Sequence, residues 1–196
     1  MPPAAVKTIR DLIFWQYAKI IGESAGMGKR NYGFVMNKFK QLRQGEIFWD
    51  EIREYVKEKE LKNECIFCGS RADLTLEHLL PRSFNGPDTE KNVIWICKTC
   101  NSSKRSRRLY EYFAIEAGVE AAKYDVPRIA EGKYLKFAYE TLKENGFLEM
   151  QQAELNQKIC PECDMKSLCI RQDTEGKISP FCIDGLLTLS YKTKPR

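Results

Sequence analysis

The chain has 196 residues, of which 43% are hydrophobic and 30% are charged, and its net charge is +5. This composition supports a buried core of one or two modest domains and excludes an intrinsically disordered chain. No apolar run reaches the ~18 residues that a membrane span needs, and the N-terminus lacks the pattern of an export signal. Eight cysteines without an export signal favour metal binding in a reducing compartment, so we expect a cytoplasmic protein without membrane contact.

Residues 1–61 are expected to form an N-terminal helical region. Apolar residues recur at helical spacing over 4–21, 33–44 and 48–60, which predicts three amphipathic helices. Their aromatic side chains are expected to pack between the helices rather than to bind a ligand.

Residues 62–108 hold two Cys-x2-Cys pairs, Cys65 with Cys68 and Cys97 with Cys100, separated by 28 residues. Two pairs at this spacing are typical of two zinc knuckles. Because the chain has a single histidine, we expect a structural Zn²⁺ held by four thiolates, a closed shell with no position for a reactive water. The alternatives are four unrelated thiols, a disulfide pair, or a zinc ribbon without chemistry.

The residues between and after these pairs predict the order strand, loop, strand, helix. Two short β-prone runs cover 74–76 and 93–96, and residues 98–108 contain neither proline nor glycine. Glu77 and His78 directly follow the first run. His78 is the only histidine of the chain, so any imidazole chemistry takes place there.

These residue types suit the hydrolysis of a phosphodiester. A neutral imidazole, with an ordinary pKa of about 6.5, is a suitable general base near neutral pH. Carboxylate and amide oxygens suit a hard divalent ion, which stabilises the leaving oxygen. We therefore assign His78 as general base, and Glu77 and Asn101 as ligands of a catalytic Mg²⁺ or Mn²⁺. Each also has an ordinary structural interpretation, as a partly buried ring, a surface carboxylate or a helix cap.

This segment resembles the HNH endonuclease family, whose fold is a ββα-metal unit. The resemblance covers residues 65 to about 108 and rests on Cys-x2-Cys, Glu-His-Leu-Leu-Pro, a central Asn and Cys-x2-Cys-Asn-x2-Lys. It places the family's first histidine at His78, its central asparagine at Asn92 and its last position at Asn101, where Asn replaces His. It implies that all three act in catalysis with Glu77, that Asn92 orients the His78 ring through a hydrogen bond, and that DNA is cut to 5′-phosphate and 3′-hydroxyl ends.

Positive charge is concentrated on the same segment. Residues 62–108 carry nine Lys or Arg and five Asp or Glu, whereas residues 109–158 carry six and nine. Such a basic segment fits a polyanion, and we expect double-stranded DNA as partner. The candidate phosphate contacts are the cations of the loop and of the following basic run: Arg82, Lys91, Lys104, Arg105, Arg107 and Arg108. Cutting both strands with one site per chain would favour a homodimer or a partner protein.

Residues 109–158 are expected to form a second helical region, with helices over 109–122 and from Pro127 to about Gly146. A C-terminal module, 159–196, then carries four more cysteines, spaced Cys-x2-Cys-x5-Cys-x12-Cys: Cys160, Cys163, Cys169 and Cys182. An all-thiolate site accepts Zn²⁺ or an iron–sulfur cluster such as [4Fe–4S]. Its first ten residues resemble the iron–sulfur staple of certain helicase-associated and CRISPR-associated exonucleases.

The sequence thus predicts an α+β protein, mostly α. A small ββα-metal unit with a four-cysteine zinc site would lie inside a helical scaffold, followed by a cysteine-rich metal-binding lobe. The predicted function is a metal-dependent HNH-type DNA endonuclease. The alternatives are a nucleic-acid-binding zinc protein without catalysis, such as a regulator or assembly factor, and a redox-responsive switch built on the C-terminal thiols.

Overall fold

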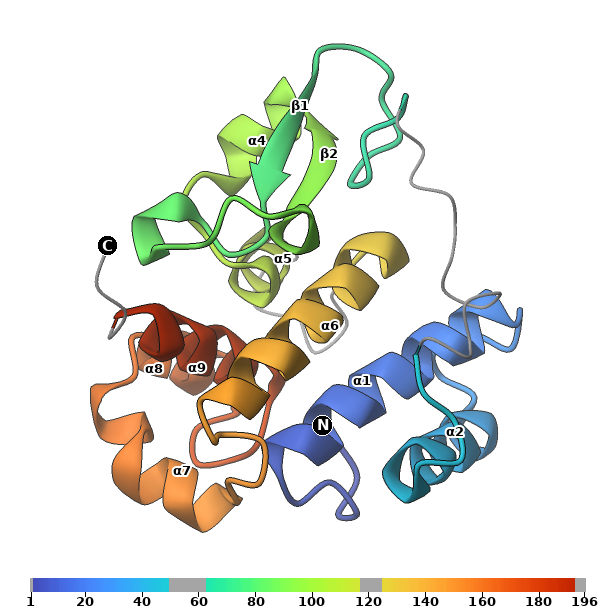
Figure 1. Ribbon diagram of the computed structural model, residues 1–196, viewed down its shortest axis with the longest axis vertical. Coiled ribbons are helices and arrows are strands. Elements are labelled where there is room, and N and C mark those ends of the chain that lie inside the picture. Colours follow the sequence, from blue (N-terminus) through green and yellow to red (C-terminus); the bar gives the residue numbers. More distant parts are fainter. Residues whose placement is uncertain (1, 50–62, 117–124, 193–196) are drawn as a thin grey trace.

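The computed structural model describes residues 2–49, 63–116 and 125–192 (Figure 1). The helix expected over 48–60 lies almost wholly outside this part of the chain, as does the end of the one expected over 109–122. In chain order the elements are α1 (Ile9–Ser24), α2 (Tyr32–Gln44), β1 (Leu74–His78), η1 (Arg82–Phe84), η2 (Glu90–Asn92), β2 (Val93–Cys97), α4 (Lys98–Lys104), α5 (Leu109–Glu116), α6 (Arg128–Glu144), α7 (Gln152–Lys158), η3 (Cys160–Glu162), α8 (Lys166–Arg171) and α9 (Pro180–Lys192).

The fold is mostly helical with one small sheet, as the predicted α+β class requires. Strands β1 and β2 pair antiparallel, and α4 follows β2 directly, so the predicted order of strand, loop, strand and helix is confirmed. In Figure 1 this ββα unit stands at one end of the molecule, above a body of helices. Within the described residues, no helix is long and apolar enough to cross a membrane.

Helix α1 begins five residues later than its apolar pattern predicts. Thr8 is held in an extended conformation by a bridge to Gln151, and its hydroxyl accepts a hydrogen bond from the backbone N of Asp11 at 3.1 Å. This cap satisfies one of the free N–H groups at the start of the helix. Helix α2 follows its prediction closely and ends at Gly45, whose φ of 73° is in the left-handed region that favours glycine.

Helices α1, α5, α6 and α9 pack together in the body of the molecule (Figure 1). The carboxylate of Asp184 on α9 joins three of them: it accepts hydrogen bonds from the hydroxyl of Tyr134 on α6 (2.6 Å) and from the backbone N of Glu111 on α5 (2.8 Å). Burial raises the pKa of Asp184 to about 6. This shared carboxylate fixes the helices that support the ββα unit.

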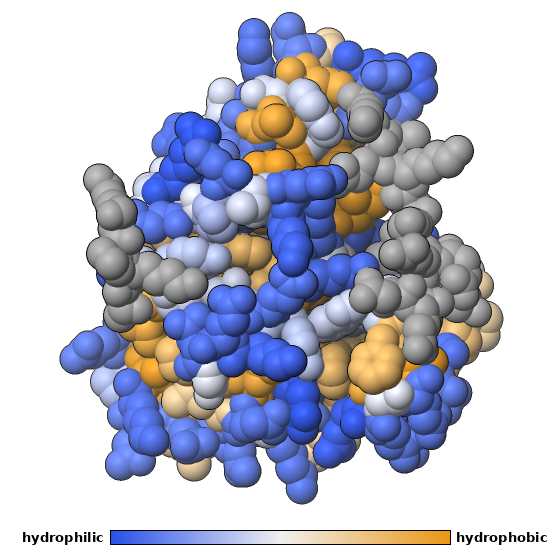
Figure 2. All heavy atoms as spheres, viewed as in Figure 1, coloured by the Kyte–Doolittle hydropathy of each residue, from blue (hydrophilic) through white to orange (hydrophobic). Residues whose placement is uncertain are grey.

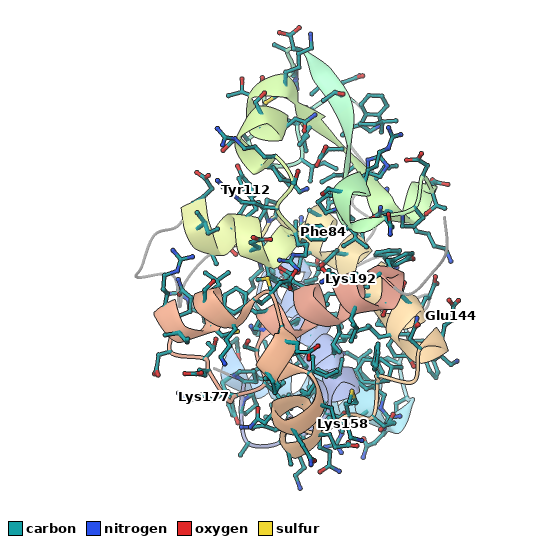
Figure 3. All side chains as sticks on the ribbon, turned by 90° about the vertical axis from the view of Figure 1, so that its left-hand side faces the viewer. Phe84, Tyr112, Glu144, Lys158, Lys177 and Lys192 are labelled. Atoms are coloured by element: carbon teal, nitrogen blue, oxygen red, sulfur yellow. The ribbon has the colours of Figure 1, made fainter. Side chains whose placement is uncertain are left out.

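The C-terminal segment packs against this helical body, whereas the sequence predicts a separate lobe. Phe181, Ile183, Leu186 and Leu187 of α9 belong to the same buried core as the residues of α1 and α6. Figure 3 places Phe84, from the loop of the ββα unit, at the junction with α9, whose last residue is Lys192. The body therefore supports the ββα unit from below through α9.

The candidate active site and its zinc site

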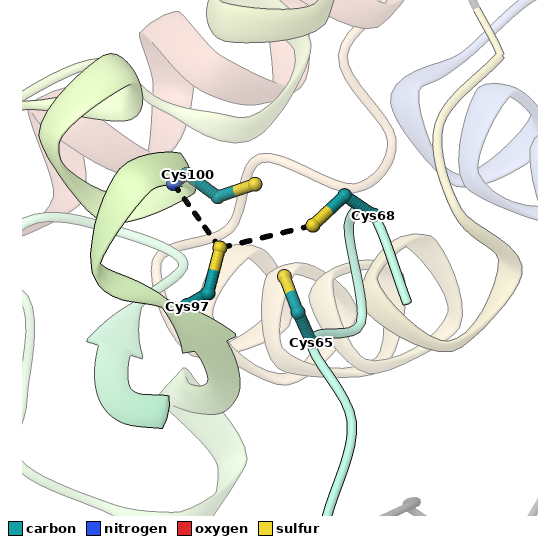
Figure 4. A group of neighbouring side chains, drawn as sticks. All are labelled: Cys65, Cys68, Cys97 and Cys100. Carbon is teal, nitrogen blue, oxygen red and sulfur yellow. Dashed lines mark hydrogen bonds between the residues drawn. The ribbon is translucent and has the colours of Figure 1, made fainter. Parts of the chain in front are cut away.

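The first cysteine group is a compact arrangement of four sulfurs. Cys65 and Cys68 lie in a tight turn before β1, Cys97 ends β2 and Cys100 lies in the first turn of α4 (Figure 4). All four Sγ atoms lie within 4.8 Å of one another, and those of Cys68 and Cys97 are 3.7 Å apart. Four thiolates around one zinc, with Zn–S bonds of about 2.3 Å, have sulfurs about 3.8 Å apart. The residues therefore fit a mononuclear metal site.

Because the four sulfurs lie close together, the pKa values of two of the thiols shift in opposite directions. The backbone N–H of Cys100 donates to Sγ of Cys97 at 3.5 Å, and this bond, with the neighbouring thiols, lowers the pKa of Cys97 to about 7. Burial and the same neighbours raise the pKa of the Cys100 thiol well above its usual range. Only a cation among the sulfurs stabilises all four as thiolates.

Glu77 and His78 are the last two residues of β1, and they point in different directions. Consecutive side chains of a strand project to opposite sides. The carboxylate of Glu77 meets α4, whereas the ring of His78 meets the loop between the strands. Both side chains line a hollow of about 610 Å³ beside the sheet. The structure thus brings together the predicted acid and the predicted base.

Lys104 is the partner of Glu77, and its position corrects the expectation that it contacts DNA. Its side chain is fully buried, and Nζ donates to Oε1 of Glu77 and to the backbone O of His78, both at 2.8 Å. Burial lowers the pKa of Lys104, while Glu77 opposes that shift. An ammonium group so enclosed holds Glu77 and the end of β1 in place, and it is not accessible to a phosphate.

The ring of His78 is held by a residue that the sequence analysis missed. Oδ1 of Asp88 lies 2.5 Å from Nε2 of His78, and the same oxygen accepts from Nε of Arg82 at 2.9 Å. Hydrogen bonds from Arg82 and then from His78 lower the pKa of Asp88, so its carboxylate is an acceptor only. Nε2 must then carry the ring proton, which leaves Nδ1 as the nitrogen able to accept one. Asp88 has no distinctive sequence context, so only the fold could identify it.

Asn92 has a different role from the one that the family resemblance implies. It is fully buried, and its side chain binds backbone groups of the loop: Oδ1 accepts from the N of Leu80 at 2.8 Å, and Nδ2 donates to the O atoms of Leu80 and Pro87 at 3.0 Å. The expected hydrogen bond to the His78 ring is not among these. A Cβ on Gly86 would lie 1.9 Å from the O of Leu80, so the loop closes tightly around the amide. Asn92 therefore fixes the loop that presents Asp88.

The candidate DNA contacts fall into two groups. Arg82 and Arg105 are exposed and line the hollow. Arg82 also pairs with Asp88 (2.9 Å), and the other four candidates have acidic partners as well. Lys91 pairs with Glu140 (2.6 Å), Arg107 with Glu116 (3.2 Å), Lys104 with Glu77, and Arg108 with Glu111 and Asp164. Burial removes Lys104 and Arg108, which is 3% exposed, from the candidate surface.

Asn101 lies one turn before Lys104 on α4. Residues three apart share a helix face, so Asn101 is on the side of α4 that faces β1. Its side chain is half-buried and does not line the hollow.

Comparison with known proteins identifies part of the chain. Residues 65–110, which contain the ββα unit and its four cysteines, match the HNH endonuclease family. No curated protein and no solved structure matches the chain. The match covers the candidate site and ends within α5, so this segment is similar to HNH endonucleases and lies within a larger helical fold.

Proposed function

We propose that the protein is a metal-dependent DNA endonuclease whose site is built from Glu77, His78 and Asn101. The observation that carries this proposal is the meeting of Glu77 and His78 in one hollow, within a segment that matches the HNH endonucleases. A carboxylate, an imidazole and exposed cations around one opening are what phosphodiester hydrolysis requires.

The base in this proposal is Nδ1 of His78. Asp88 accepts from Nε2 and so fixes the tautomer in which Nδ1 takes a proton from the attacking water. Asp88 is a positioning residue, held in turn by Arg82. Arg82 and Arg105 contact phosphates on either side of the scissile bond; these contacts place the DNA without reading its sequence.

Glu77 is suited to share its carboxylate between two cations. Lys104 occupies Oε1, which leaves Oε2 for a divalent ion together with the amide oxygen of Asn101. Such an ion, when bound, would stabilise the charge that develops on the phosphate and on the leaving oxygen. Lys104 keeps the carboxylate oriented and prevents it from turning away.

Cleavage of supercoiled plasmid with Mg²⁺, Mn²⁺ or EDTA tests the proposal. We expect cleavage by the wild type that EDTA abolishes, and we expect Glu77→Gln to need more Mg²⁺ for half-maximal cleavage. Glu90→Gln is the matched control, because Glu90 lines the same hollow and is exposed. Cleavage that resists EDTA, or that responds equally to the two substitutions, would contradict the metal role of Glu77.

A nucleic-acid-binding protein without catalysis is the second candidate. The ion pair between Glu77 and Lys104 favours it, because a carboxylate that is already neutralised needs no metal ion. This candidate predicts DNA binding by the zinc-loaded wild type and no cleavage with any divalent ion.

A further inference from the structure

The C-terminal cysteines converge on one cavity although 21 residues separate the first from the last. Cys160 lies in η3, Cys163 follows it, Cys169 lies in α8 and Cys182 in the first turn of α9. All four line a cavity of about 280 Å³, here called the C-terminal cavity. The rest of its wall is largely apolar, with Leu155, Ile159, Phe181 and Leu186 among its residues. Four partly buried sulfurs that face one cavity form a ligand set for a soft metal centre.

The spacing of these sulfurs separates the cavity from the zinc site. No three of the four lie within 4.8 Å of one another, although all belong to the described part of the chain; the first cysteine group meets that limit with all four. A single zinc needs sulfurs about 3.8 Å apart. A cubane cluster places one thiolate on each of its four iron corners, so it needs sulfurs spread around a space that the cluster fills. We propose that the C-terminal cavity holds a [4Fe–4S] cluster bound by the four cysteines that line it.

The walls of the cavity carry further features of a cluster site. A Cβ on Gly185 would lie 2.7 Å from Sγ of Cys163, so glycine at this position lets α9 approach the sulfur. The backbone N of Ser179 donates to Sγ of Cys182 at 3.5 Å, a bond that stabilises thiolate charge. Three charged residues also line the cavity: Lys166 and Lys177 oppose the negative charge of a four-thiolate cluster, whereas Glu175 adds to it. Lys177 also pairs with Asp173 at 3.4 Å.

The cluster has a structural role next to the nuclease unit. Asp164, beside Cys163, accepts two hydrogen bonds from Nη1 of Arg108, at 2.9 and 2.8 Å. Arg108 also donates to Thr188 on α9 at 2.7 Å and lies over the ring of Phe84, 4.6 Å from its centre. These bonds of Arg108 tie the segment that follows α4 to the residues after η3 and to α9. A cluster that holds η3 against α9 would keep them in place. This inference concerns a separate site and stands or falls independently of the proposed nuclease activity.

Metal and sulfide analysis of the full chain, expressed with added iron and cysteine and purified without oxygen, tests this inference. We expect a single equivalent of zinc together with iron and acid-labile sulfide in the ratio of a cubane, and a broad visible absorption. Two equivalents of zinc without iron or sulfide, or failure to take up iron and sulfide on reconstitution, would overturn it. The wild-type protein alone decides this outcome, so it does not depend on how a variant folds.

Three variants sharpen the assignment. Cys169→Ser should lose iron, sulfide and visible absorption while it keeps zinc, and the matched Cys68→Ser should do the reverse. Gly185→Ala should lower cluster content without removing a ligand, because its methyl group would collide with Sγ of Cys163. Full iron content in Cys169→Ser would contradict the proposed ligand set.

Discussion

The two cysteine groups gather their sulfurs differently, and the difference reflects where each group lies in the fold. In the ββα unit, two tight turns bring four sulfurs within 4.8 Å, the geometry of one small ion. In the C-terminal segment, short helices hold four sulfurs around a cavity of about 280 Å³. Equal numbers of cysteines therefore do not predict equal arrangements of sulfurs: residues close to the sheet form a compact group, whereas packing of separate elements forms a wider one.

The groups also differ in what surrounds them. The first cysteine group supports a two-stranded sheet that carries Glu77 and His78 and lies at one end of the molecule (Figure 1). The C-terminal cavity lies against α9, a helix that is part of the large core. In the view of Figure 2, hydrophilic side chains cover most of the face of that body. We therefore expect loss of metal to unfold the first region and to loosen the second.

The largest expected effect is that of Cys97→Ser. Loss of a thiolate that shares its site with three others should release zinc, whose binding stabilises small zinc domains by about 10 kcal/mol or more. The ββα unit should unfold and plasmid cleavage should fall below detection. Zinc content and cleavage check this, with Thr99→Ala as control, because Thr99 is exposed between the two cysteines. A Cys97→Ser protein that keeps zinc and cuts DNA would contradict the claim that the ββα unit depends on metal bound by its four cysteines.

A smaller effect is expected of Cys163→Ser. We expect it to lose the C-terminal metal and to expose the segment around η3 and α8 to proteases, while the ββα unit keeps its zinc and most of its activity. Limited proteolysis and metal analysis of one preparation measure both results. Retention of the full metal content would defeat the claim that Cys163 is a ligand.

Lys104→Met should destabilise the protein by about 3 kcal/mol, because it removes one partner of a buried ion pair and leaves Glu77 without its ammonium. Urea unfolding measures this difference. Lys98→Met on the same helix is the control, since Lys98 is exposed. Equal stabilities of the two variants would show that the buried pair does not hold β1 against α4.

The smallest effect is a pH dependence of the helical body. The pKa of Asp184 is about 6 in the folded protein, above the ordinary value of about 3.9. A raised pKa contributes stability that is fully present below about pH 3.9 and is lost as the pH rises through about 6. Between about pH 5 and pH 8 the free energy of unfolding should fall by on the order of 1 kcal/mol more in the wild type than in Asp184→Asn. Parallel pH profiles of the free energy of unfolding in the two proteins would contradict this role of Asp184.

Sequence reasoning predicted the ββα order and the compact cysteine group because both depend on local spacing. The two Cys-x2-Cys pairs lie at the turn before β1 and at the junction of β2 with α4, and the β-prone runs between them pair with each other. The ββα unit could therefore be predicted from residues that lie close together in the chain.

Contacts between distant residues were beyond sequence reasoning. Lys104 stands in a basic run and was interpreted as a surface cation, but α4 turns it onto β1, where it is fully buried. Asp88 meets His78 only because the loop folds back around the buried amide of Asn92. Both contacts depend on how a helix or a loop packs on the sheet, and no local sequence pattern predicts that packing.

Plasmid cleavage and DNA binding by wild type and His78→Ala, at equal zinc content, test the central claim most directly. Thr89→Ala is the matched control, because Thr89 is exposed and lines the same hollow. We predict that His78→Ala binds DNA as the wild type does but cuts it about 10²–10⁴-fold more slowly, the usual loss of a general base. Equal cleavage rates in the two proteins would contradict the assignment of His78 as the base.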